Sequence, residues 1–171
     1  MKQPATKHTR RWGSRTGSAM LEFAIGWFVM TTGFTAAFQY GYEFYQYNSL
    51  FKSVNNAARY AALYPYDASC TTPSTTYSTN VKNMVVYGNA SGTGSPVLSG
   101  LATTNVNLKV AGIGDCASGN WAPTSVTVTI GGKDASNTQV PTYTVSAIFG
   151  SFVIDGKPIV KYPYQGVYQP Y

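Results

Sequence analysis

Histidine is nearly absent from this chain, and cysteine and acidic residues are scarce. The 171 residues include one histidine, His8, two cysteines, Cys70 and Cys116, and six acidic side chains. Histidine is the usual general base near neutral pH, so the chain beyond residue 8 offers no Ser-His or Cys-His arrangement. Two cysteines without a nearby histidine cannot fill a zinc shell. We therefore expect no catalytic residue, no metal site and no cofactor, and predict that the protein is not an enzyme.

The acidic residues are also dispersed, which argues against carboxylate chemistry. They are Glu22, Glu43, Asp67, Asp115, Asp134 and Asp155. None stands beside another in the way that suggests a paired-carboxylate site. The glycine-rich segments, such as Gly112-Ile-Gly114, lack the lysine and the helix context of a phosphate loop, so they indicate turns. We expect no small-molecule substrate.

The positive charge of the chain belongs to its first 17 residues. Residues 1–17 carry five of the 12 basic side chains and no acid, whereas residues 18–171 carry seven basic groups against six acidic ones. The formal charge of +6 therefore falls to +1 in the body of the protein. A clustered Lys/Arg face is missing there, so we predict no nucleic-acid partner.

An uncharged run follows this basic leader. Residues 23–42 contain no Asp, Glu, Lys or Arg, and a helix of that length spans about 30 Å, one bilayer core. Positive charges before the span and none directly after it place the N-terminus in the cytoplasm. Cys70 and Cys116 then lie outside the cytoplasm, where a disulfide between them is expected. Two free buried thiols are the alternative.

The helix is predicted to continue beyond the membrane, over residues 18–64. A stripe with alternating steps of three and four residues supports it, and Pro65 ends it. The stripe comprises Phe23, Gly26, Met30, Gly33, Ala37, Tyr40, Phe44, Tyr47, Phe51, Val54, Ala58 and Ala61. Within it Gly33, Ala37 and Gly41 recur every four residues, a spacing that favours close helix packing. The alternative is that glycine and alanine are simply common in membrane helices.

The remainder, residues 65–171, is predicted to be β-rich. Three segments alternate apolar and polar residues, around 106–110, 126–130 and 143–149, which is typical of half-buried strands. Asp155-Gly156 suggests a hairpin between 152–154 and 158–160. Residues 71–80 suggest a loop, and Val81–Tyr87 a less distinct strand. The expected fold is α+β: a long N-terminal helix with a small antiparallel sheet packed on its outer half.

The most informative segment is Gly17-Ser-Ala-Met-Leu-Glu22-Phe23. A small residue ends a basic leader, and a lone carboxylate opens the uncharged span. Cleavage between Gly17 and Ser18 would create an α-amine four residues before Glu22. That amine can neutralise the carboxylate of Glu22 on a neighbouring subunit, which would favour correct assembly. The alternative is a glutamate that simply reaches the headgroups.

Gly17↓Ser18-x-x-x-Glu22-Phe23 resembles a type IV prepilin processing site. Residues 17–24, Glu43 and the segment 54–63 resemble, more narrowly, the TadE-like proteins, which are minor pilins or pseudopilins of tight-adherence pili. Phe28 stands where that family often has a proline. The resemblance covers residues 17–64 and implies a pilin-like fold and cleavage by a prepilin peptidase. It also implies an inner-membrane precursor that joins other pilin subunits and the assembly machinery in a pilus at the cell surface, with a role in assembly or adhesion.

Two other interpretations remain. In the first, a Sec signal is removed after Ala37, because Thr35-Ala-Ala37 has small residues at both recognition positions. The product would be a secreted, soluble, β-rich binding protein. In the second, the chain is an uncleaved inner-membrane protein with a periplasmic sensor domain. Glu22 at the head of the apolar run, and the stripe that passes through the Ala37 cut, favour the pilin interpretation.

Overall fold

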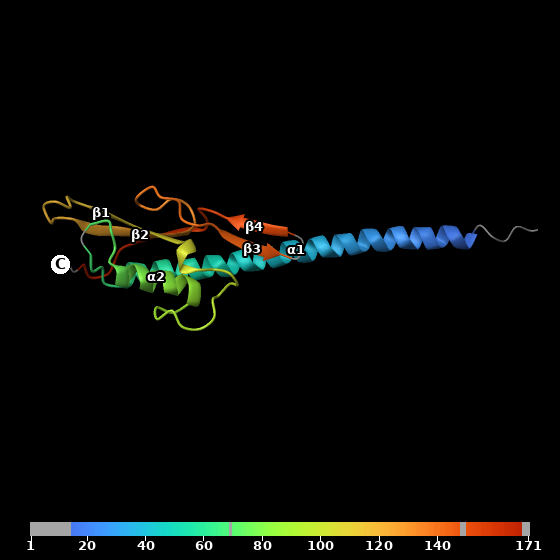
Figure 1. Ribbon diagram of the computed structural model, residues 1–171, viewed down its shortest axis with the longest axis horizontal. Coiled ribbons are helices and arrows are strands. Elements are labelled where there is room, and N and C mark those ends of the chain that lie inside the picture. The colour runs from blue at the N-terminus through green and yellow to red at the C-terminus, as the bar shows by residue number, and fades with distance from the viewer. Residues whose placement is uncertain (1–14, 69, 148–149, 169–171) are drawn as a thin grey trace, which may run out of the picture. The chain divides into compact units, whose positions relative to one another are not determined.

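The computed structural model describes residues 15–68, 70–147 and 150–168, and it is an α+β protein with one long helix (Figure 1). Most of the predicted leader, residues 1–14 with His8, and Phe149 of the predicted third strand lie outside the described residues. The elements are α1 (Arg15–Leu63), α2 (Thr75–Tyr87), a 3₁₀ turn η1 (Thr103–Asn105), β1 (Val106–Ile113), β2 (Ala122–Ile130), β3 (Tyr143–Ala147), β4 (Gly150–Ile154) and β5 (Ile159–Pro163).

Helix α1 contributes to two compact units of the chain, Met1–Tyr40 and Gly41–Tyr171. The long helix predicted over residues 18–64 is confirmed: α1 begins three residues before the predicted start and ends one residue before the predicted end. Its residues from Gly17 onward are long and apolar enough to cross a membrane, and the apolar window is not buried by the rest of the chain. By length and composition this segment is suited to be a membrane anchor or a signal sequence.

The buried face of α1 differs from the predicted stripe. The buried positions are Gln46, Leu50, Ser53, Val54, Ala57, Ala58, Ala61 and Ala62. Val54, Ala58 and Ala61 were predicted correctly, but Phe44 and Phe51 are 69% and 44% exposed. The reason is that small side chains let neighbouring elements approach closely, so the alanine-rich face packs and the bulky aromatic residues remain outside. We call these eight residues the packed seam.

Helix α2 replaces the second part of the loop predicted over 71–80 and the whole strand predicted over Val81–Tyr87. The loop prediction holds only for residues 71–74, and the strand prediction is wrong. The Ser74 hydroxyl accepts a hydrogen bond from the backbone N–H of Tyr77 and caps the helix start. Gly88, in the left-handed conformation at φ 72°, ends it. Tyr77, Val81 and Val85 recur every four residues on the buried face. Packing of this face against α1 overrides the strand preference of valine, and the Ser53 hydroxyl donates to the carbonyl of Val85.

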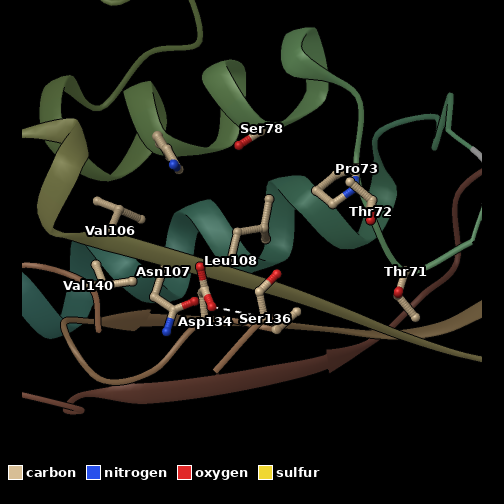
Figure 2. Close-up of a pocket in the computed structure, with 12 residues that line it drawn as sticks. Thr71, Thr72, Pro73, Ser78, Val106, Asn107, Leu108, Asp134, Ser136 and Val140 are labelled. Carbon is tan, nitrogen blue, oxygen red and sulfur yellow. Dashed lines mark hydrogen bonds between the residues drawn. The ribbon is translucent and has the colours of Figure 1, made fainter. Parts of the chain in front are cut away.

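The strands form two small antiparallel sheets instead of the single one expected. Strands β1, β2 and β5 form a sheet in that order, and β3 pairs with β4. The predicted alternation is confirmed in β2, where Val126, Val128 and Ile130 are buried, and in β3, where Tyr143 and Val145 are buried. In β1 the prediction is only partly right, because Asn107 is buried as well. Helix α2, β1 and the loop 131–140 surround a small polar pocket (Figure 2).

The hairpin predicted at Asp155-Gly156 is wrong. The strand before it, β4, pairs with β3, and the strand after it, β5, pairs with β2, so the two flanking strands belong to different sheets. The Asp155 carboxylate instead accepts a hydrogen bond from the N–H of Gly132, at 2.6 Å. The segment is therefore a connection between sheets, which a local turn signal cannot distinguish from a hairpin.

An aromatic cluster closes the end of the second unit. Tyr66 packs against Tyr77, Trp121, Tyr164 and Tyr168 with ring centroids 5.2–6.3 Å apart. We call residues 164–168 the C-terminal strap. Its Gln165 and Gly166 N–H groups both donate to the carbonyl of Ala62. The strap therefore satisfies a backbone acceptor that the end of α1 leaves without an intrahelical partner.

Candidate functional site

The residues of the predicted processing site lie in the first turns of α1. Gly17, Ser18 and Glu22 are all helical and exposed. Ser18 and Glu22 are four positions apart, so they lie on one helix face, one turn apart. A Cβ atom on Gly17 would have nothing within 4 Å. Packing against the residues that the structure describes therefore gives no reason for a glycine at this position.

The predicted helix-packing residues show the same lack of neighbours. Gly33, Ala37 and Gly41 are exposed, and a Cβ on Gly26, Gly33 or Gly41 would likewise have nothing within 4 Å. Each glycine in a helix interior costs about 1 kcal/mol relative to alanine. The four glycines of α1 thus weaken the helix, and no close contact among the described residues requires them.

Two threonines in this part of α1 are satisfied by the helix itself. The hydroxyls of Thr31 and Thr32 donate to the carbonyls of Trp27 and Phe28, each at 2.8 Å. Such internal hydrogen bonds let threonine lie in apolar surroundings without an unpaired donor. The Phe23 and Trp27 rings stack with centroids 6.3 Å apart. This surface is suited to lipid or to another helix.

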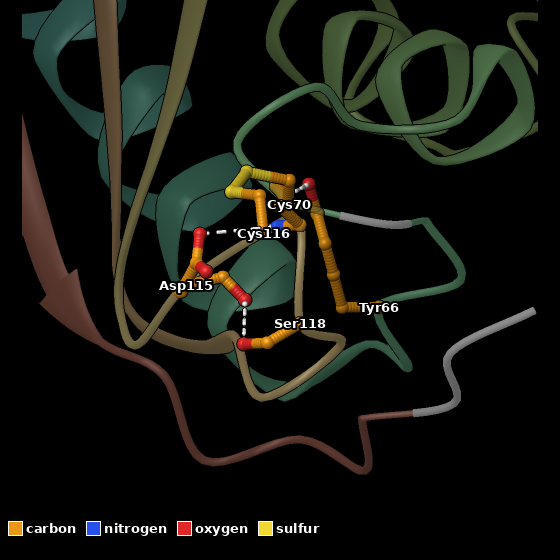
Figure 3. Close-up of a disulfide and its surroundings, with 6 residues drawn as sticks. Tyr66, Cys70, Asp115, Cys116 and Ser118 are labelled. Carbon is orange, nitrogen blue, oxygen red and sulfur yellow. Dashed lines mark hydrogen bonds between the residues drawn. A yellow bond between two sulfur atoms is a disulfide. The ribbon is translucent and has the colours of Figure 1, made fainter.

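The two cysteines are bonded, as predicted (Figure 3). Their Cα atoms lie 5.4 Å apart, and the bond links the segment after α1 to the β1–β2 connection. The Tyr66 hydroxyl donates to the carbonyl of Cys70 at 2.7 Å. On the other side, the Ser118 hydroxyl donates to the carbonyl of Asp115 at 3.2 Å. The disulfide thus ties the aromatic cluster to the three-stranded sheet.

The aromatic cluster is the part of the molecule that sequence reasoning missed. Burial is the main cause that raises the pKa of Tyr66 and of Tyr77 well above the usual value for a phenol, and neighbouring tyrosines and Asp67 add to it. The Tyr77 hydroxyl donates to the carbonyl of Ala61 at 2.5 Å. The sequence contains a signal for this cluster only in its density of tyrosines before residue 66 and after residue 161.

The structure does not gather the chemistry-bearing residues into one centre. Gly17, Ser18, Glu22, Gly33 and Ala37 belong to the first unit, and Gly41, Cys70 and Cys116 to the second. Among the described residues, no group of three or more His, Cys, Asp or Glu side chains is placed to hold a metal ion. What α1 offers is an exposed apolar surface with a carboxylate near its start, long and apolar enough to cross a membrane.

Comparison with known proteins gives no relative: no family model, no curated protein and no solved structure matches this chain.

Proposed function

We propose that this chain is a minor pilin or pseudopilin, similar to the TadE-like proteins, in the assembly or structure of a bacterial type IV-like pilus. The observation that carries the proposal is the exposure of the side chains of residues 17–40. None of their described side chains is buried, yet they include three helix-weakening glycines that no contact in the described part of the chain requires. Such a helix gains its stabilisation from an outside partner, first lipid and then neighbouring helices.

The order of features along the chain supports the same proposal. A basic leader, Gly17-Ser18, Glu22 and an apolar helix follow one another as in a type IV prepilin. In this proposal the precursor lies in the inner membrane with its N-terminus in the cytoplasm, a prepilin peptidase cleaves it, and other pilin subunits then receive it. The extracytoplasmic domain would reach the pilus or cell surface and can serve adhesion. The protein acts by packing and not by catalysis.

Processing provides the direct test. We expect the mature chain to begin at Ser18, as measured by the intact mass of the protein from membrane or sheared-filament fractions. Gly17→Val should keep the leader, because the peptidase must approach the backbone closely at a residue without a side chain. Gly26→Val is the matched control, since Gly26 is also helical and has nothing near its Cβ. Normal cleavage of Gly17→Val would contradict the proposal.

A secreted, soluble binding protein cleaved after Ala37 is the second candidate. The division of the chain between Tyr40 and Gly41 favours it, because the second unit contains all the residues of the buried core. A mature chain that begins at Phe38 would keep that core intact. The same mass measurement separates the candidates, since a start at Phe38 supports secretion and a start at Ser18 supports the pilin.

A further inference from the structure

The second unit contains a polar pocket that the proposed function does not use. Its volume is about 180 Å³, and it lies between α2, β1 and the loop 131–140 (Figure 2). That is room for several water molecules but below the usual size of a site for drug-sized ligands. Ser78 and Lys82 of α2 line it, together with Asn107 of β1 and Asp134 of the loop. An occupant of this pocket is therefore small and polar.

Two opposite charges line this pocket without neutralising each other. Within residues 15–68, 70–147 and 150–168, neither Lys82 nor Asp134 has an ion-pair partner. Asp134 Oδ1 accepts from the N–H groups of Ser136 and Thr138, at 2.9 and 2.8 Å. These bonds fold the loop and leave the other carboxylate oxygen available. The pocket thus offers one ammonium group and one carboxylate oxygen to an occupant.

Asn107 holds the loop 131–140 against β1 beside the pocket. Its side chain is only 3% exposed, and Nδ2 donates to the carbonyls of Gly131 and Lys133, at 3.2 and 2.8 Å. Its Oδ1 is buried and has no hydrogen-bond partner among the described residues, so it is not within reach of an occupant of the pocket. Asn107 therefore fixes the loop that carries Asp134, and the groups that an occupant can meet are those of Lys82, Asp134 and the serines.

We propose that the pocket binds a single acidic sugar residue, a hexuronate, by its carboxylate and its hydroxyl groups. The carboxylate pairs with Lys82, and a ring hydroxyl donates to Asp134. The hydroxyls of Ser78 and Ser136 both donate and accept, so they match a ligand rich in hydroxyls. Val140, which is half-buried and also lines the pocket, provides an aliphatic surface for the C–H face of the sugar ring.

Other small ligands fit these groups less well. A neutral sugar leaves the Lys82 ammonium without an anion. A free amino acid can pair with both charges, but it has no hydroxyl groups to match the serines. The inference does not rest on filament assembly, because the pocket lies wholly within the second unit.

The test uses the full chain in detergent micelles and three probes: methyl β-glucuronide, methyl β-glucoside and alanine. Saturation-transfer NMR titration measures each dissociation constant, expected on the order of 1 mM for the glucuronide. Lys82→Gln should weaken glucuronide binding at least about fivefold. Asp134→Asn, which keeps Oδ1 for the loop, should weaken it similarly. Lys161→Gln removes an exposed lysine of β5 outside the pocket and should have no effect.

Thermal unfolding of each variant shows that the fold is retained, so lost binding cannot be ascribed to unfolding. The proposal holds if the glucuronide binds more tightly than the glucoside and alanine, and if only the two pocket variants lose that preference. Absence of saturable glucuronide binding overturns it. Equal binding of the glucoside, tighter binding of alanine, or unchanged glucuronide binding by Lys82→Gln overturns it as well.

Discussion

The two parts of helix α1 have the same backbone but opposite relations to the rest of the chain. In residues 17–40 no side chain is buried, and the surface is formed by large apolar residues and glycines. In residues 41–63 the packed seam of Leu50, Val54 and mostly small residues is buried against α2 and the sheets. The helical backbone alone therefore does not distinguish the two parts. They differ in whether the rest of the same chain packs against them. The second part finds its partner in its own chain, and the first part finds none among the described residues.

The largest effect is expected at Glu22, which tests whether the first part packs in an assembly. Glu22→Gln should leave synthesis, processing and insertion unchanged but block entry into filaments. Removal of one member of a desolvated charge pair costs about 3–5 kcal/mol, a change of orders of magnitude in assembly. Co-purification with sheared pili, with immunoblots for the processed form, measures this. Glu22→Asp, which keeps the charge, is the control. Wild-type incorporation of Glu22→Gln would reduce Glu22 to a headgroup anchor.

The disulfide tests how far the stability of the second unit, Gly41–Tyr171, depends on its covalent crosslink. Replacement of both Cys70 and Cys116 by serine should lower the free energy of unfolding by about 4 kcal/mol, because the bond closes a loop of 46 residues in the unfolded chain. Chemical denaturation of the oxidised protein and of the double variant gives the difference. Ser118→Ala in the same loop should cost less than about 1 kcal/mol. Both cysteines alkylated in never-reduced protein would contradict the bond.

Leu50 and Phe44 test the boundary of the packed seam directly. Leu50 is fully buried, whereas Phe44 is 69% exposed. Leu50→Ala should cost about 3 kcal/mol of unfolding free energy, because it leaves a cavity. Phe44→Ala should change it by less than about 0.5 kcal/mol. Equal losses in chemical denaturation would show that the aromatic stripe, and not the alanine-rich face, stabilises the domain.

The aromatic cluster predicts a loss of stability in strong alkali. The native pKa values of Tyr66 and Tyr77 are raised above the ordinary value of 10.0, so the unfolded chain releases these protons first. Stability is therefore full below pH 10 and falls above it, by up to about 1.4 kcal/mol per pH unit for each tyrosine. Urea midpoints between pH 7 and pH 11.5 measure the fall, and Tyr45→Phe, at an exposed tyrosine, should leave it unchanged. A flat profile would show that these phenols ionise normally.

Local sequence patterns predicted the helices and strands better than they predicted which of these elements pack together. The alternation of Val126, Val128 and Ile130 correctly indicated a strand with one buried face, and Pro65 correctly placed the end of α1. The valines of α2 favoured a strand because β-branched residues prefer extended backbone. The structure places Ser74 and the left-handed Gly88 at the two ends of the helix, where serine and glycine are common.

The candidate sites also differ in how far local sequence could predict them. The disulfide was predictable because the chain has only two cysteines, and both follow the apolar span. The pocket was not, because Lys82, Asn107 and Asp134 come from three separate segments and have no common motif. The aromatic cluster likewise joins Tyr66, Trp121 and the C-terminal strap, which are far apart in sequence.

By itself the sequence determined that α1 is one long helix, that its residues 23–42 are uncharged and largely apolar, and that short alternating strands follow. These properties depend on neighbours a few positions apart, within reach of local hydrogen bonds and periodicity. Only the tertiary structure decided which face of α1 is buried, that β4 and β5 belong to different sheets, and that the C-terminal strap closes the end of α1. Those choices depend on close packing between distant segments, where the size of a side chain such as alanine outweighs its hydrophobicity.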